Sequence, residues 1–483
     1  MRRWITGIAL IIGLMGAFAQ PPITEPLFDT AWPTWGRDLR RSHFAGDFAG
    51  PDNPVVLWFQ RNGALDEPAI FEPEIWVPQH PAAGLRYTSY TFYDAASGQL
   101  TGVFGPFWGV PATPIFMNAA VIVIDNNGFL VLTVPWLALM LSGGQYECLL
   151  FSPSPVDGVP SISWTIRGIP AYRTGFGATT DGFYIYPVFA DNFGYITFLF
   201  LAWIIVVDSN GNIQQVIPDY GGFIFDQIPS AALSSVSGTQ DGLLLLFGFH
   251  NGLVAAVAVD PFAGTIDYAW ITDLPTLSDN GSGPEVRSDS VDRPIAVTSD
   301  ETTAIVCGSN SGRVYGVSLA DGSRQWEYQA GGAIMGGPSI GPDPNNGDED
   351  TVYIVVRHSP TQSAIHAIRA SDGEGKWVRV LPNVSRCTPT IDQNGVLYLG
   401  DERGFLYAIN PNNTVKWQTY LSAPIRVAPV IGEFDFRGTP TTFMFVAASN
   451  RFLYAIVDRS VLSTRSTPGV GGVNTLPRSG GAQ

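Results

Sequence analysis

The chain has 483 residues, of which 45% are hydrophobic and 14% are charged, and its formal net charge is −16. This composition supplies enough apolar material for a large core and excludes an intrinsically disordered chain. The acidity also excludes nucleic acid as an expected partner, because such a surface repels phosphates.

The first residues have the pattern of a secretory signal peptide. Arg2 and Arg3 are followed by an apolar stretch at 5–15 and by the small-x-small sequence at 17–19. This order of features is typical of a leader that is cleaved after export. We therefore expect residues 1–19 to be a signal peptide, residues 20–53 to be an N-terminal entry segment, and the protein to be secreted or periplasmic.

Two later apolar runs, 129–141 and 193–207, are too short for the roughly 20 residues of a membrane-spanning helix. Both are rich in β-branched and aromatic residues and end at turn residues, which favours buried strands and predicts no transmembrane span. The same half of the chain carries unusually apolar inserts at 64–87, 137–160 and 188–200. These inserts are candidates for a partner surface on loops.

An internal repeat is clearest in the C-terminal half. Residues 316–326 read GVSLADGSRQW, 367–377 read AIRASDGEGKW and 408–417 read AINPNNTVKW. Degenerate copies begin at 92, 206 and 258, and we expect the copy at Ala258 to close with Tyr268. A further copy begins at 455, and the gap after 92 leaves room for one more, which gives eight units.

Each unit combines a small residue, a turn of Asp, Asn or Gly, and a closing Trp or Tyr that can cover the seam between sheets. A pair of strands precedes each unit, so about four strands recur every 50 residues. This repetition predicts an all-β fold over residues 54–458, an eight-bladed β-propeller of four-stranded antiparallel blades.

The last unit stops after its third strand. Residues 54–60 have the apolar character and the tryptophan of an outermost strand. We predict that this N-terminal strand closes the ring by pairing with the strand near 452–457, which removes two exposed sheet edges. Residues 459–483 lack an apolar pattern and are predicted to be a disordered tail.

The repeat resembles the PQQ-like repeat of the quinoprotein-dehydrogenase-like propellers. Ala367, Gly373 and Trp377 occupy the matching positions, and the segment 32–38 resembles the entry of secreted members. The resemblance implies the propeller fold, but not an activity, because the superfamily holds both enzymes and noncatalytic scaffolds.

The enzymatic members are expected to hold the quinone under a disulfide of adjacent cysteines and to bind calcium with carboxylates. Here the three cysteines, Cys148, Cys307 and Cys387, are far apart in the sequence and have no metal-ligand spacing. We therefore expect no PQQ and no catalytic residues, and we interpret the cysteines as small buried side chains.

One candidate metal site remains, in the acidic segment 343–350. Asp343, Asn345, Asp348 and Asp350 alternate as oxygen ligands around a glycine, a pattern that suits Ca²⁺. The alternative interpretation is a solvated acidic hairpin loop.

These observations favour a secreted or periplasmic, noncatalytic propeller that serves as a binding or scaffolding module for a protein or glycan partner. The alternative is a quinone- or metal-dependent oxidoreductase of the quinoprotein superfamily. The sequence does not indicate an oligomeric state.

Overall fold

The computed structural model describes most of the chain between residues 36 and 463. The described residues are 36–38, 40–61, 67–79, 87–108, 121–124, 130–139, 145–153, 160–170, 185–190, 196–200, 203–207, 213–217, 233–240, 243–249, 252–260, 265–273, 289–291, 293–344 and 346–463. The predicted signal peptide, and the predicted tail from residue 464 onward, lie outside them.

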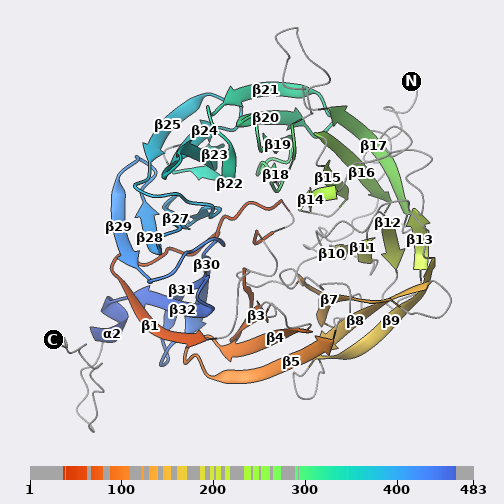
Figure 1. Ribbon diagram of the computed structural model, residues 1–483, viewed down its shortest axis with the longest axis horizontal. Helices are drawn as coiled ribbons and strands as arrows, with labels where there is room; N and C mark the ends of the chain where they lie inside the picture. Colours follow the sequence, from red (N-terminus) through yellow and green to blue (C-terminus); the bar gives the residue numbers. More distant parts are fainter. Residues whose placement is uncertain are drawn as a thin grey trace, which may run out of the picture.

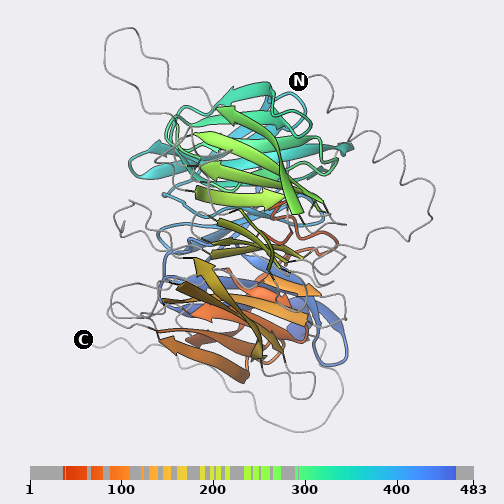
Figure 2. The same ribbon diagram turned by 90° about the vertical axis from the view of Figure 1, so that its right-hand side faces the viewer.

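The described strands form eight four-stranded antiparallel sheets, which Figure 1 shows arranged in a ring. In seven of them the four strands follow one another along the chain, from the inside of the ring to its rim. Seen from the side, neighbouring sheets are stacked face to face (Figure 2). The predicted β-propeller of four-stranded blades is therefore confirmed.

The blades of the N-terminal half have these strands: β2 (Ala69–Phe71), β3 (Glu74–Gln79), β4 (Tyr87–Asp94) and β5 (Leu100–Trp108); β6 (Val121–Ile124), β7 (Leu130–Leu139), β8 (Gln145–Pro153) and β9 (Pro160–Pro170); β10 (Ile185–Ala190), β11 (Ile196–Phe200), β12 (Trp203–Val207) and β13 (Ile213–Ile217); β14 (Leu233–Gly238), β15 (Leu244–Phe249), β16 (Leu253–Asp260) and β17 (Thr265–Asp273). Within the apolar runs at 129–141 and 193–207, the described residues 130–139, 196–200 and 203–207 form strands. No helix among the described residues is long and apolar enough to cross a membrane.

The C-terminal blades have these strands: β18 (Ala296–Val297), β19 (Thr303–Gly308), β20 (Arg313–Ser318) and β21 (Arg324–Gln329); β22 (Ile334–Asp343), β23 (Asn346–Ser359), β24 (Gln362–Arg369) and β25 (Gly375–Val380); β26 (Thr390–Ile391), β27 (Leu397–Gly400), β28 (Phe405–Ile409) and β29 (Val415–Tyr420); β30 (Val430–Asp435), β31 (Pro440–Ala448) and β32 (Phe452–Asp458). A short helix, α2 (Ser460–Ser463), follows β32, so the first residues of the predicted tail are helical.

The last blade is completed by β1 (Pro54–Arg61), which pairs with β32. Pro54 lies opposite Asp458 and Arg61 lies opposite Phe452, so the two strands are antiparallel over their whole length. The predicted closure by the N-terminal strand is confirmed. Because β1 and β32 come from opposite ends of the propeller sequence, their pairing closes the ring.

Tryptophans on the outermost strands join neighbouring blades. The indole Nε1 of Trp326 on β21 donates to the carbonyl of Ala370 in the next blade at 2.8 Å, and Trp377 and Trp417 do the same to Pro411 and Pro51. Such a buried ring covers apolar surface while its N–H is satisfied. The predicted role of the closing tryptophan is confirmed for these three copies.

The prediction for the copy at Ala258 is wrong by two residues. Trp270 on β17, rather than Tyr268, donates across the seam to Leu319, and it lies opposite Ala256 as Trp377 lies opposite Ala367. The hairpin of β16 and β17 continues to the pair Asp260 and Thr265, so its closing tryptophan is further along the chain. Trp58 on β1 makes the equivalent bond to Ala95.

Candidate functional site

The N-terminal segment from Gly36 to Gly50 crosses the inner ends of three blades before it reaches β1 at the rim (Figure 1). Its backbone bonds each inner strand in turn. Val297 of β18 donates to Arg40 at 3.0 Å, Ile340 of β22 donates to Ser42 at 2.9 Å, and Ile391 of β26 donates to His43 at 2.9 Å. The segment therefore fills this part of the axial region with the chain's own backbone.

A buried polar cluster holds this segment in place. Its members are Asp38, Arg41, Ser42 and His43 of the segment and Glu67, which precedes β2. We call it the axial cluster. Arg41 and His43 adopt left-handed backbone conformations, with φ of 56° and 52°, which non-glycine residues hold only where the surroundings fix them.

The carboxylates of the axial cluster accept hydrogen bonds from the N-terminal segment. The Asp38 carboxylate accepts from the backbone N–H and the hydroxyl of Ser42 at 2.9 and 2.7 Å. Glu67 accepts from the backbone N–H of Gly36 at 2.8 Å and lies 3.6 Å from Nε2 of His43. His43 is 0% exposed and Glu67 is 1% exposed, so neither reaches solvent. Buried carboxylates are tolerated where they accept hydrogen bonds, and the arrangement suits a structural role.

The two described cysteine side chains are unreactive thiols. Cys307 lies in β19 and Cys387 lies before β26, and both are free and fully buried. Burial raises the pKa of each thiol to about 12, so both stay protonated near neutral pH. Cys148 lies in β8, and its side chain is outside the described residues. The structure gives no described residues that fit a quinone held under a disulfide of adjacent cysteines.

The predicted calcium residues lie at the hairpin between β22 and β23. Asp343 ends β22 and is bonded by Lys376, while Asp350 accepts the backbone N–H of Ser299 at 2.6 Å. Asn345 and the side chain of Asp348 are outside the described residues. Within the described part, no three His, Cys, Asp or Glu side chains are grouped as metal ligands. The calcium site therefore stays a prediction.

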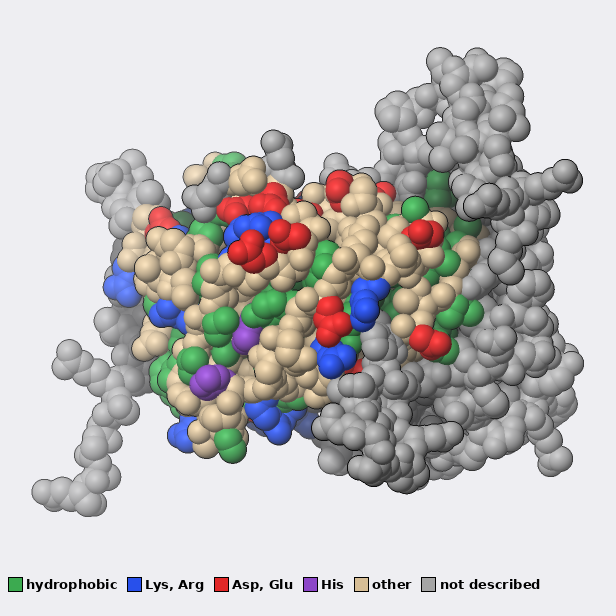
Figure 3. Space-filling model, turned by 90° about the horizontal axis from the view of Figure 1, so that it is seen from above, with side chains coloured by type: hydrophobic (Ala, Val, Ile, Leu, Met, Phe, Trp, Pro, Cys, Tyr) green, Lys and Arg blue, Asp and Glu red, His purple; other side chains and the backbone are tan. Residues whose placement is uncertain are grey.

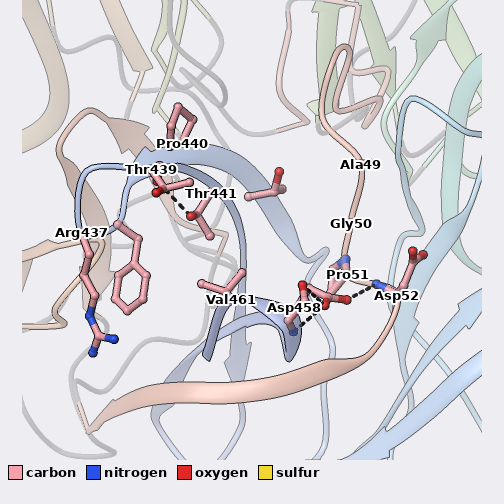
Figure 4. A pocket seen from close by; sticks show the side chains of 13 residues that line it. Ala49, Gly50, Pro51, Asp52, Arg437, Thr439, Pro440, Thr441, Asp458 and Val461 are labelled. Atoms are coloured by element: carbon pink, nitrogen blue, oxygen red, sulfur yellow. Dashed lines mark hydrogen bonds between the residues drawn. The ribbon is translucent and has the colours of Figure 1, made fainter. Parts of the chain in front are cut away.

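A pocket of about 510 Å³ opens where the ring is closed (Figure 4). Its walls come from residues 49–52, from the hairpin at 436–442 and from residues 458–461. Between them, Asp458 accepts the backbone N–H groups of Asp52 at 2.9 Å, Asn53 at 2.7 Å and Ser460 at 2.8 Å. Its volume suits a small molecule, but its carboxylate is already satisfied by the chain.

The fold is that of the quinoprotein-like propellers. The quinohemoprotein alcohol dehydrogenase of Comamonas testosteroni superposes with a TM-score of 0.58 at 10% identity, covering 92% of this chain and 82% of the dehydrogenase. A europium-containing methanol dehydrogenase has a TM-score of 0.58 at 11% identity, covering 89% and 98%. BamB from Moraxella catarrhalis has a TM-score of 0.50 at 12% identity, covering 84% and 99%.

These similarities show the propeller fold that the repeat predicts. No family model matches the sequence, and a search of curated proteins found no match. The neighbours include dehydrogenases and BamB, so the fold alone is compatible with both functions considered from the sequence.

The axial cluster was not predicted. His43 and Glu67 are 24 positions apart and belong to no repeat, so their spacing in the sequence does not indicate their contact.

A repeated pattern that the sequence does contain is an aspartate six residues before a tyrosine. Asp392 accepts from the hydroxyl of Tyr398 at 2.9 Å and Asp401 from that of Tyr407 at 2.7 Å.

Proposed function

We propose that this protein is a noncatalytic, extracytoplasmic propeller that acts as a binding or scaffolding module for a protein partner. The observation that carries the proposal is the N-terminal segment across the inner ends of three blades. Backbone that is bonded strand by strand, together with carboxylates of Asp38 and Glu67 that already accept from the chain, favours a structural over a catalytic role for the described part of this region.

Two further observations support a noncatalytic role. The thiols of Cys307 and Cys387 are buried and protonated, so they are poor nucleophiles and poor metal ligands. The carboxylates of the axial cluster, Asp38 and Glu67, accept hydrogen bonds from the chain itself. Extracytoplasmic location is supported by the leader-like sequence of residues 1–19.

The alternative, a quinone- or metal-dependent oxidoreductase, draws support from the structural similarity to the two dehydrogenases. The two functions are separated by thermal unfolding of the purified protein with PQQ, Ca²⁺ and EDTA, together with alcohol-dependent dye reduction. A ligand at 100 times its Kd adds about 2.7 kcal/mol to the free energy of unfolding.

We expect PQQ to add nothing to the melting temperature that is measured with Ca²⁺ alone, and alcohols to give no dye reduction. A rise of the melting temperature with PQQ, accompanied by alcohol-dependent dye reduction, would contradict the noncatalytic proposal.

A further inference from the structure

The exposed large apolar side chains of the described residues are concentrated on the rim of the ring. Apart from Leu462 in α2, all of them lie on β1, β5, β25 and β29. These are the outermost strands of four blades that follow one another around the ring (Figure 1). Single exposed apolar residues are ordinary on a protein surface, but a concentration on neighbouring strands indicates a contact surface.

The most aromatic part of this rim lies on β1 and β32. Phe59 is 55% exposed, and its ring centroid lies 5.6 Å from that of Phe452 and 6.2 Å from that of Tyr454. Phe59 lies opposite Tyr454, and Arg61 lies opposite Phe452. Because directly paired residues project from the same face of a sheet, these four side chains form one patch.

The patch faces β29 of the preceding blade. The hydroxyl of Tyr454 donates to the carbonyl of Leu421, directly after β29, at 3.0 Å. The alternate residues Trp58 and Gln60 bond Ala95 and Gly98 in the opposite direction, toward the following blade. The patch therefore lies on the side of β1 and β32 that faces β29, and we call it the rim patch.

The described charge beside the rim patch is opposite in sign to the net charge of the protein. Arg61 lies opposite Phe452, and Arg451 directly precedes Phe452 in the sequence. Neither arginine has a carboxylate within ion-pair distance among the described residues. By contrast, Lys416 is paired with Asp52 and Arg426 with Glu402. On a chain of net charge −16, these two arginines, without an ion pair among the described residues, lie near the exposed ring of Phe59 and the half-buried ring of Phe452 and favour an acidic ligand.

We propose that the rim patch binds an extended, acidic segment of a partner protein that carries aromatic side chains. Among the described strands β1 ends its sheet, so its outer edge offers backbone groups to such a segment. The aromatic side chains of the segment pack on Phe59 and Phe452, and its carboxylates pair with Arg61 and Arg451. A second copy of this chain fits less well, because its arginines would meet these arginines.

The probe is a fluorescein-labelled peptide of sequence DDFDFDD, with SSFSFSS and KKFKFKK as counterparts, followed by fluorescence anisotropy. We expect DDFDFDD to bind about tenfold more tightly than either counterpart, and added salt to weaken it. Phe59→Ser and Arg61→Glu each weaken its binding about tenfold. Both side chains are exposed, so the melting temperature of each variant stays at that of the wild-type protein.

The matched control is Val380→Ser, which removes an exposed apolar side chain from the rim strand of another blade and leaves binding unchanged. The proposal is overturned if the three peptides bind equally or not at all, or if Val380→Ser weakens binding as much as Phe59→Ser. Self-association that is lost in Phe59→Ser also overturns it, in favour of a second copy. The PQQ experiment is independent of this one, because a propeller with or without catalysis can carry the rim patch.

Discussion

Gly373 and the indole ring of Trp326 fit each other so closely that the glycine has no room for a side chain. A Cβ on Gly373 would lie 2.6 Å from the ring, and the residue has a φ of 76°. Gly322 and Gly98 have the same relation to Trp270 and Trp58. The turn glycine of the repeat is therefore required both by its left-handed backbone and by the tryptophan from the preceding blade.

Substitution of Gly373 separates these two requirements. Gly373→Ala is expected to destabilise the protein by about 2–4 kcal/mol, because overpacking adds to backbone strain. Gly331→Ala, with a φ of 79° and no atom within 4 Å of the new Cβ, carries the strain alone and costs about 1 kcal/mol. Gly347→Ala adds neither overpacking nor backbone strain. Denaturant unfolding measures all three, and equal losses for Gly373→Ala and Gly331→Ala would show that the tryptophan contact does not matter.

His366 couples the seam between two blades to pH. Its Nδ1 lies 2.9 Å from the hydroxyl of Tyr328 in the preceding blade, and burial, followed by the charge of His358, lowers its pKa to about 4. Figure 3, which looks at the molecule from above, shows histidine side chains among apolar ones on this rim. A proton on the imidazole is thus disfavoured in the folded state.

The lowered pKa of His366 sets the direction in which stability depends on pH. The unfolded chain binds a proton on His366 near pH 6.5, whereas the folded chain does so only near pH 4. The free energy of unfolding is therefore undiminished above pH 6.5 and falls by up to about 3 kcal/mol as the pH drops toward 4. In His366→Gln the loss between pH 6.5 and 5 is smaller, as measured by denaturant unfolding at each pH. An unchanged slope would assign the loss to other groups.

The start of the closing strand β1 is held by the carboxylate of Asp458 on β32, which lies opposite Pro54. Partial burial alone would raise the pKa of Asp458, but hydrogen bonds from Ser460, Asn53 and Asp52 hold it below its usual value. Asp458→Ala removes the acceptor of three backbone N–H groups and is expected to destabilise the protein by about 1–3 kcal/mol. Hydrogen exchange should then speed up first in β1. Asp435→Ala, which affects the N–H of Gly438, is the control, and uniform exchange in both variants would contradict this role.

The hairpin of β22 and β23 is the element on which the calcium prediction depends. If it binds Ca²⁺, the ion competes with Lys376 for Asp343, so added Ca²⁺ raises the melting temperature and EDTA lowers it. Asp343→Asn abolishes both effects, while Asp435→Asn, at another hairpin, preserves them. If neither Ca²⁺ nor EDTA changes the melting temperature of the wild-type protein, the prediction is wrong.

At the scale of the whole molecule, the fold could be predicted because its signals are local and repeated. Trp326, Trp377 and Trp417 recur with a small residue and a turn before them, and each makes the same seam contact. Trp270 was not predicted because the hairpin of β16 and β17 is longer than those of the other copies. The length of a hairpin depends on strand pairing, which cannot be read from the spacing of the repeat. The axial cluster depends on contacts between distant, non-repeated residues such as His43 and Glu67, and only the three-dimensional structure brings them together.

The closure of the ring also makes the linear order of the blades incidental. The N–H of Arg459 donates to the carbonyl of Asn53 at 2.8 Å, so the first and last residues of the propeller are neighbours. The blades form a closed ring, and the propeller sequence begins and ends within one blade. A circular permutant that joins these two points by a short linker and opens instead at Gly331, between two blades, would keep every strand pair while moving the cut from inside a sheet to a connection between sheets.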